Sequence, residues 1–330
     1  MSVLKTLDDE SINCCVTSPP YYYLRDYGVN GQIGLEETPE EYIQKLVEIF
    51  REVRRVLKKD GTLWVNIADS YAGSGKGASI YPSNAKNYKQ GTNKGSVGSY
   101  IPKTTAACCK PKDLIGIPWA LAFALRNDGW YLRQDIIWQK PNPMPESVKD
   151  RCTKSHEYIF LLSKSPRYYF DSKAIQEDSV SYDKRPSALQ RAREKNYATK
   201  DRINPEAYRK SVPRYGGKKY TENPDLFYRT KSGNAYDPRP KRNKRDVWTV
   251  TTKPFKGAHF ATFPPDLIEP CILAGCPVGG VVLDPFAGSG TTGMVAKQHG
   301  RKFVLIELNE EYVRLCEKRT ADDFQMKMKF

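Results

Sequence analysis

The chain has 330 residues and a formal net charge of +15 at pH 7, a length that allows one large α/β domain or a domain carrying an insertion. It contains no stretch of about 18 consecutive apolar residues, and its N-terminus lacks the apolar core of a signal peptide. These features exclude a transmembrane helix and secretion, so we predict a cytoplasmic protein with no membrane partner.

Cysteine and histidine usage argues against a metalloprotein. The eight cysteines include no Cys-x-x-Cys pair and only three histidines are present, so we predict no metal site. Adjacent and scattered cysteines suit a reducing compartment better than a disulfide framework.

The first predicted element is a strand over residues 12–16, followed by the turn Ser18-Pro19-Pro20-Tyr21. Ser18 offers a hydroxyl acceptor, and the proline pair fixes φ and leaves a backbone carbonyl without a competing donor. Tyr21 offers a flat surface on which a base can stack. The turn therefore combines groups suited to act on a planar amino group. We interpret Cys14 and Cys15, in the strand, as small core residues.

A helix and a second strand follow this turn. Thr38-Pro39-Glu40-Glu41 is a capping box with proline at the first helical position, and apolar residues then recur at helical spacing as far as Leu57. Gly61 ends this pattern, and residues 62–67 predict a strand. A strand, a helix and a strand in this order form a βαβ unit, which predicts a parallel sheet.

The middle of the chain predicts a helix over 118–127 and strands over 130–138 and 157–163. The segment 181–245 then carries 19 Lys and Arg, 7 Asp and Glu, and 7 Tyr. Such concentrated positive charge indicates a polyanionic partner, most simply nucleic acid. A solvated charged insert is the alternative, although disordered segments are poor in aromatic residues.

The last part of the chain predicts a nucleotide-binding βαβ unit. A short helix over 265–274, with Gly275 as its C-terminal cap, precedes a strand over 281–284. Three glycines follow, and a strand over 303–307 ends in Glu307, which can pair with ribose hydroxyls.

Two cofactors are compatible with this unit. The glycines at 288, 290 and 293 formally satisfy the dinucleotide fingerprint, so an NAD-dependent oxidoreductase is one alternative. Asp284 stands just before them, and its carboxylate would repel a pyrophosphate but attract an ammonium or sulfonium group. This charge favours S-adenosyl-L-methionine.

Together these motifs resemble those of the DNA amino-methyltransferases, which methylate exocyclic amino groups with S-adenosyl-L-methionine. Ser18-Pro19-Pro20-Tyr21 matches their catalytic motif, (Ser/Asn/Asp)-Pro-Pro-(Tyr/Phe), and residues 284–290 match their cofactor motif. The catalytic motif comes first, as in the circularly permuted beta class. The resemblance implies an α/β fold with a doubly wound, Rossmann-like methyltransferase sheet. It also implies a catalytic half at 1–180, an inserted target-recognition region at 181–245 and a cofactor-binding half at 246–330.

The resemblance assigns roles to single residues. The Ser18 hydroxyl and the Pro19 carbonyl would hold the amino group, and Tyr21, after Pro20, would stack on a base flipped out of the duplex. The cofactor-binding set is Asp284, Phe286, Gly288, Gly290 and Glu307, with Phe260 and Thr262 from the preceding motif. Asp69 is a further candidate for lining the pocket. Relatives usually carry a strand ending in Gly-Asp shortly before the equivalent of Leu7; here we expect that strand and its acid to be missing.

Serine at the first catalytic position favours the N4 amino group of cytosine, whereas the N6 amino group of adenine is the alternative. The expected partner is double-stranded DNA, and a restriction endonuclease for the same site would be a separate protein. Two further hypotheses stay open, an inactive DNA-binding protein and the NAD-dependent oxidoreductase. The DNA-contact candidates are Arg185, Arg191, Arg193, Arg214, Lys218, Lys219 and Arg229.

Overall fold

A computed structural model describes residues 2–24, 27, 29–72, 109–178, 228–229, 235–236, 241–252 and 263–322. The chain divides into two compact units, one built from Met1–Ile175 and Arg245–Phe330 and the other from Gln176–Lys244. No helix within these described ranges is long and apolar enough to cross a membrane.

The first unit is built around a seven-stranded sheet with the strand order β11-β10-β1-β2-β4-β3-β9. β4 runs antiparallel to both of its neighbours, whereas the other pairings are parallel. The strands are β1 Ile12–Thr17, β2 Leu57–Ile67, β3 Tyr131–Gln139, β4 His156–Ser163, β9 Val247–Thr249, β10 Val281–Asp284 and β11 Lys302–Leu305. The carboxyl ends of β10, β1 and β2 therefore lie side by side at the same end of the sheet, together with the start of β4.

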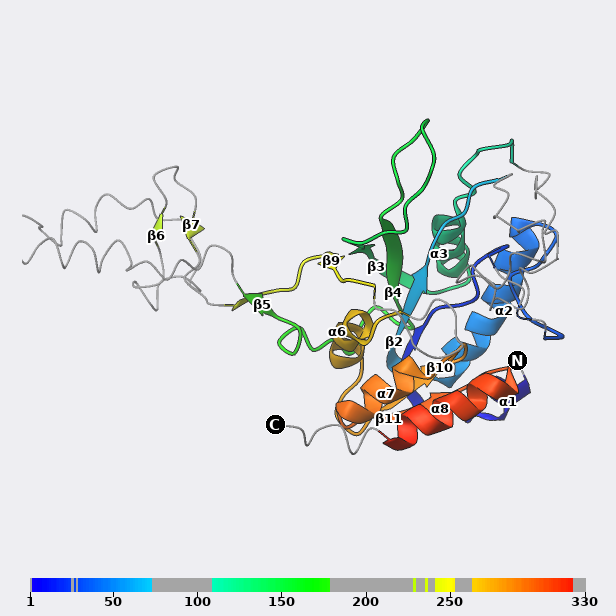
Figure 1. Cartoon of the computed structure of the whole chain (residues 1–330). Coiled ribbons are helices and arrows are strands. Elements are labelled where there is room, and N and C mark those ends of the chain that lie inside the picture. The colour runs from blue at the N-terminus through cyan, green and yellow to red at the C-terminus, as the bar shows by residue number, and fades with distance from the viewer. Residues whose placement is uncertain are drawn as a thin grey trace, which may run out of the picture. The chain divides into compact units, whose positions relative to one another are not determined.

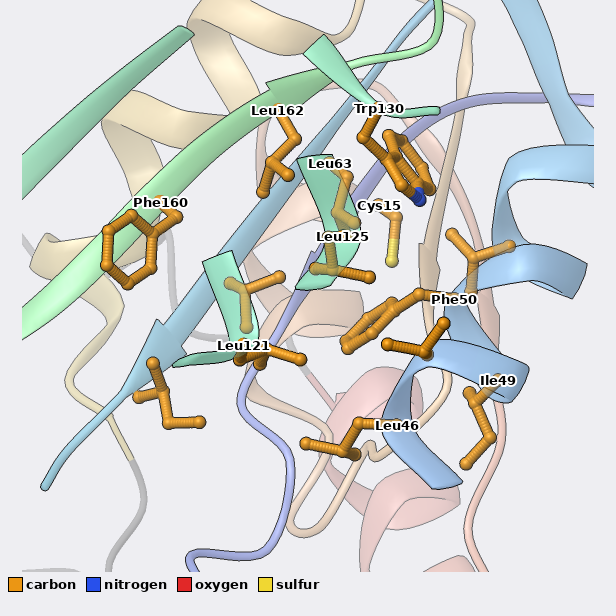
Figure 2. Packing of buried hydrophobic residues seen from close by; sticks show 14 of the residues in the cluster. Cys15, Leu46, Ile49, Phe50, Leu63, Leu121, Leu125, Trp130, Phe160 and Leu162 are labelled. Carbon is orange, nitrogen blue, oxygen red and sulfur yellow. The ribbon is translucent and has the colours of Figure 1, made fainter. Parts of the chain in front are cut away.

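Helices cover both faces of this sheet (Figure 1). On one face Phe50 of α2 and Leu121 of α3 pack with Cys15 and Leu63 of the sheet (Figure 2). On the other face α6 and α7 pack around Cys14 and neighbouring strand residues. This arrangement confirms the predicted doubly wound α/β fold. The helices are α1 Ser2–Thr6, α2 Pro39–Val56, α3 Ile117–Asn127, α6 Pro265–Gly275, α7 Thr291–Gln298 and α8 Glu310–Asp322.

The N-terminus of α2 follows the predicted capping pattern. The Thr38 hydroxyl accepts a hydrogen bond of 3.2 Å from the backbone N–H of Glu41, and Pro39 occupies the first turn. The predicted C-terminus was wrong, because α2 ends at Val56 and Gly61 lies inside β2. Leu57 is already extended and pairs with Ile12 of β1, and a register shift before Cys14 absorbs the additional residues.

Gly275 was wrongly predicted to cap α6. It is the last residue of the helix, and Cys276 is the cap. A Cβ atom at position 275 would lie 2.6 Å from Trp64 Nε1, 2.7 Å from Thr62 Oγ1 and 2.8 Å from Cys14 Sγ. Glycine is therefore required here because α6 approaches β1 and β2 closely, and not because the backbone is left-handed.

The second unit includes two short antiparallel strand pairs among its described residues. β5 Glu177–Asp178 pairs with β8 Lys241–Arg242, and β6 Tyr228–Arg229 pairs with β7 Ala235–Tyr236. Arg229 is thus placed in β6. The other six DNA-contact candidates lie outside the described residues.

Candidate functional site

A cavity of about 380 Å³ lies where β1 and β10 end. Its walls include Ser18 to Tyr21 after β1 and Pro285 to Ser289 after β10. The volume falls in the range of about 300 to 1,000 Å³ that is usual for small-molecule sites. The fold therefore brings the predicted catalytic motif and the predicted cofactor turn to one cavity, although they are far apart in the sequence.

The two proline carbonyls of the catalytic turn differ in their contacts. The Tyr42 hydroxyl, which extends from α2, donates a hydrogen bond of 2.7 Å to the Pro20 carbonyl. Within the described part of the chain, no donor forms such a bond with the Pro19 carbonyl. The Pro19 carbonyl thus keeps the acceptor capacity that the sequence assigned to it.

Tyr21 is held at its hydroxyl end. The Tyr21 hydroxyl donates a hydrogen bond of 2.6 Å to Glu157 Oε2 and lies 3.2 Å from Asn66 Oδ1. Burial, followed by the nearby Glu157 carboxylate, raises the pKa of Tyr21 well above its ordinary value. Tyr21 is therefore a neutral phenol whose ring forms part of the cavity wall.

Asp284 occupies the end of β10 but does not line the cavity. Its side chain is fully buried, and its Oδ1 accepts hydrogen bonds from the Thr17 hydroxyl at 2.6 Å and from the Phe286 N–H at 3.1 Å. Its Oδ2 accepts a hydrogen bond of 2.6 Å from the Thr292 hydroxyl. Burial raises the pKa of Asp284 to about 6. The predicted ion pair with a cationic ligand is not supported, because the Asp284 side chain is fully buried and is not part of the cavity lining.

Glycines shape the turn between β10 and α7. Gly288 and Gly290 have positive φ angles of 54° and 77°, a region in which glycine has no Cβ clash. The Gly288 N–H donates a hydrogen bond of 2.7 Å to Glu307 Oε2. Glu307 lies in the loop after β11, because that strand ends two residues earlier than predicted, at Leu305. The predicted pair of glycine turn and acid is therefore assembled at the cavity wall, with Phe286 beside it.

Sequence reasoning missed Arg319 of α8, which binds the turn between β10 and α7 and is not itself part of the cavity lining. Arg319 of α8 donates hydrogen bonds of 2.7 Å to the Ser289 carbonyl and 2.6 Å to the Ser289 hydroxyl. Nothing in the local sequence signals this contact, since Arg319 is one of many basic residues near the C-terminus. Thr17 and Thr292 were missed for a different reason. Each acts through a hydrogen bond to Asp284, and these contacts are known only once the structure places the three residues together.

Asp69 and Gly290, like Asp284, are predicted site residues that do not line the cavity. The Asp69 carboxylate accepts hydrogen bonds from the backbone N–H groups of Gly116 at 2.9 Å and Ile117 at 3.1 Å. It thus satisfies free donors at the start of α3, and the prediction that it lines the pocket was wrong. Phe260 and Thr262 lie outside the described residues, although the adjacent Phe263 lines the cavity.

The charge of the cavity indicates which of the two candidate cofactors, S-adenosyl-L-methionine or NAD, fits better. Among the described lining residues Glu307 is the only charged side chain, and no lysine, arginine or histidine is present. Among these described residues a pyrophosphate would meet a carboxylate and no compensating cation, whereas an ammonium or sulfonium ligand with ribose hydroxyls fits the described walls. The residues present therefore fit S-adenosyl-L-methionine better than NAD.

Residues 12–318 match the model of a family of N6 and N4 methyltransferases described as DNA methylase. The chain belongs to this family. It is thus an S-adenosyl-L-methionine-dependent DNA methyltransferase, and the predicted resemblance is confirmed. Similar proteins include Type II methyltransferase M.SmaI of Serratia marcescens, 46% identical over 314 residues that cover 95% of this chain and 85% of the relative. Type II methyltransferase M.Cfr9I of Citrobacter freundii is 45% identical over 320 residues, covering 97% of this chain and 84% of the relative.

Solved structures share the fold of this DNA methyltransferase. The cytosine-N4-specific PvuII DNA methyltransferase matches with a TM-score of 0.57 and 18% identity, covering 97% of this chain and 83% of that chain. A Thermus thermophilus protein in complex with S-adenosyl-L-methionine matches with a TM-score of 0.54 and 21% identity, covering 98% of this chain and 91% of that chain. The predicted Rossmann-like methyltransferase sheet is confirmed.

Proposed function

We propose that this methyltransferase modifies the exocyclic N4 amino group of cytosine in double-stranded DNA. The observation that carries this proposal is the shared cavity, in which the Ser18-Pro19-Pro20-Tyr21 turn faces the turn after β10. The family includes N6 and N4 enzymes, and serine at position 18 favours the N4 type. The fold similarity to a cytosine-N4-specific methyltransferase gives further support.

The amino group of cytosine is a poor nucleophile because its lone pair is delocalised into the ring. The Ser18 hydroxyl and the Pro19 carbonyl accept hydrogen bonds from the two amino hydrogens, which favours a tetrahedral nitrogen with a localised lone pair. Tyr21 stacks on the flipped-out base and sets its plane. S-adenosyl-L-methionine, when bound, supplies an electrophilic methyl group on a sulfonium. Correct orientation of the base provides most of the rate.

The cofactor is held by the turn after β10 and by the loop after β11. Glu307 would pair with ribose hydroxyls, and Phe286 and Gly288 form the wall beside it. Gly290 would act from outside this wall, by allowing the left-handed backbone of the turn. Asp284 does not contact the cofactor in this proposal. It holds the turn in place by accepting a hydrogen bond from the Phe286 N–H. Phe260 and Thr262 are proposed to hold the methionine end.

A cysteine nucleophile takes no part in this scheme. Cys14 and Cys15 are fully buried in the sheet, which confirms their interpretation as core residues. Burial raises the pKa of both thiols well above the ordinary value, so neither forms a reactive thiolate.

Sequence recognition is assigned to residues 181–245. Their excess of Lys and Arg supplies phosphate contacts and base-edge contacts on double-stranded DNA. The seven candidate contact residues named from the sequence belong to this region. A separate restriction endonuclease that cuts the same site is the proposed biological partner, since the relatives are Type II methyltransferases.

The test is to incubate the purified protein with mixed-sequence DNA and methyl-labelled S-adenosyl-L-methionine, and then to analyse the nucleosides by mass spectrometry. We expect N4-methyldeoxycytidine. N6-methyldeoxyadenosine alone would contradict the choice of base, and absence of any methylated nucleoside would favour an inactive DNA-binding protein. Sequencing that detects modified bases in host DNA then gives the recognition site.

A further inference from the structure

A row of polar side chains extends from the catalytic turn across four neighbouring strands. Tyr21 follows β1, Asn66 belongs to β2, Glu157 to β4 and Lys140 follows β3. These strands are adjacent in the sheet in the order β1-β2-β4-β3. The four residues thus lie side by side at the same end of these strands. Asn66, Glu157 and Lys140 belong neither to the proposed catalytic motif nor to the proposed cofactor motif.

The contacts in this row converge on Glu157. Its Oε2 accepts hydrogen bonds from the Tyr21 hydroxyl at 2.6 Å and from Asn66 Nδ2 at 3.3 Å. Its Oε1 forms an ion pair with the Lys140 ammonium. Both carboxylate oxygens are therefore engaged, and Glu157 is only 8% exposed.

Lys140 and Asn66 are themselves held by further groups. The Lys140 ammonium lies 4.2 Å from the centroid of the Trp138 ring, and the Trp138 indole N–H donates a hydrogen bond of 2.8 Å to the Val250 carbonyl. Asn66 Nδ2 also donates a hydrogen bond of 3.1 Å to the Tyr158 carbonyl. The Lys140 end of the row is consequently fixed to β3 and to the residue after β9, and Asn66 is fixed to β4.

We propose that Glu157 and Lys140 are positioning residues that fix the ring of Tyr21 in the plane on which the target base stacks. A tyrosine ring attached only through its Cβ retains freedom to rotate and tilt, and a hydrogen bond at the opposite end removes that freedom. Lys140 neutralises the buried Glu157 and prevents it from turning away. The proposal rests on the proposed function, because it concerns the use of Tyr21 as a stacking surface.

Charge explains why Glu157 and Lys140 act as a pair. A buried carboxylate is costly unless it is both paired and hydrogen-bonded. Loss of Lys140 leaves Glu157 with its hydrogen bonds but without its direct ion-pair partner, so the hydrogen bond to Tyr21 weakens. Loss of the Tyr21 hydroxyl leaves the ion pair in place but frees the ring. Substitutions along the row should thus affect the same step.

The experiment compares Tyr21→Phe, Glu157→Gln and the double variant by steady-state methylation of whichever DNA base the wild type modifies. We expect kcat to fall about 10- to 100-fold in each single variant, as expected for a misplaced reacting group, with the Kd of S-adenosyl-L-methionine unchanged. The double variant should be no slower than the slower single variant, because both remove the same tether. Lys140→Met should reduce kcat similarly, and Lys140→Arg should restore part of it.

A matched control is Glu146→Gln, which breaks the more exposed pair of Glu146 with Arg151 at 2.5 Å and should keep the wild-type kcat. Full activity of Tyr21→Phe, or losses that multiply in the double variant, would overturn the inference while the wild type remains active. A lower melting temperature with unchanged kcat in Glu157→Gln would also overturn it, since this is the signature of a purely structural role. A wild type that transfers no methyl group to DNA overturns the proposed function instead, and the inference with it.

Discussion

The Thr17 hydroxyl donates a hydrogen bond of 2.6 Å to the Asp284 carboxylate, and this contact joins the carboxyl ends of β1 and β10 across 267 sequence positions. Thr17 directly precedes Ser18, the proposed catalytic residue, and Asp284 directly precedes the turn proposed to hold the cofactor. The two halves of the site are therefore fastened to each other by a buried carboxylate. Thr292 of α7 binds the second oxygen, so the start of that helix shares the same anchor.

Titration of Asp284 should make stability depend on pH. Burial raises its pKa from 3.8 to about 6, so the folded protein holds a proton there that the unfolded chain has released. The associated stability is present in full below about pH 4 and is lost by about pH 7. Relative to Asp284→Asn, which does not titrate, the wild-type free energy of unfolding should fall by about 3 kcal/mol over this range.

Denaturant unfolding at several pH values checks this prediction. The exposed Asp8→Asn variant serves as the control, and its free energy of unfolding should follow the wild-type pH profile. A constant difference between wild type and Asp284→Asn across the range would show that Asp284 does not titrate in this way.

Ser18→Ala should remove one of the two acceptors for the target amino group. We expect kcat to fall about 100- to 1,000-fold, the usual cost of one preorganised hydrogen-bonding group, while the Kd of S-adenosyl-L-methionine stays unchanged. Single-turnover methylation and calorimetric titration measure the two quantities. Ser11→Ala, at a serine whose hydroxyl binds the Asp8 carbonyl before β1, should behave as wild type. Equal loss of cofactor affinity and rate in Ser18→Ala would contradict the assigned role.

Glu307→Gln should weaken cofactor binding about 10- to 100-fold, because hydrogen bonds to a charged group contribute about 1.5 to 3 kcal/mol. The substitution also disturbs the contact with the Gly288 N–H, so the melting temperature should decrease slightly. Calorimetric titration with S-adenosyl-L-methionine gives the affinity, and Glu310→Gln, at an exposed position of α8, is the control. Unchanged affinity in Glu307→Gln would remove this residue from the cofactor site.

Gly275→Ala should destabilise the fold by about 1 to 3 kcal/mol through overpacking, since its Cβ would press on Trp64, Thr62 and Cys14. The control is Gly279→Ala, where φ is +77° but no atom lies within 4 Å of the added Cβ. That variant measures backbone strain alone, which should cost about 1 kcal/mol. Thermal unfolding compares the two, and a larger loss in Gly279→Ala would contradict the packing explanation.

The sequence by itself determined much of the local structure and the identity of the main motif residues. The Thr38 capping pattern located the start of α2, and the strands predicted at 12–16, 130–138, 157–163 and 281–284 agree with the observed ones to within one residue. The Ser18-Pro19-Pro20-Tyr21 turn and Glu307 were found because their signals are local: a strand ends and a distinctive residue follows. Backbone torsions and hydrophobic periodicity depend on near neighbours, so they can be read along the chain.

Only the tertiary structure decided which groups meet. Asp284 was expected to face a cationic ligand, but the pairing of β1 with β10 places Thr17 on one of its oxygens, and the start of α7 places Thr292 on the other. Asp69 was expected in the pocket, yet it binds the start of α3. The contact of Tyr21 with Glu157 joins the turn after β1 to β4, which is distant in the sequence. A buried polar side chain forms hydrogen bonds with the groups that lie within reach. Those groups are determined by how the strands and helices pack together in the fold.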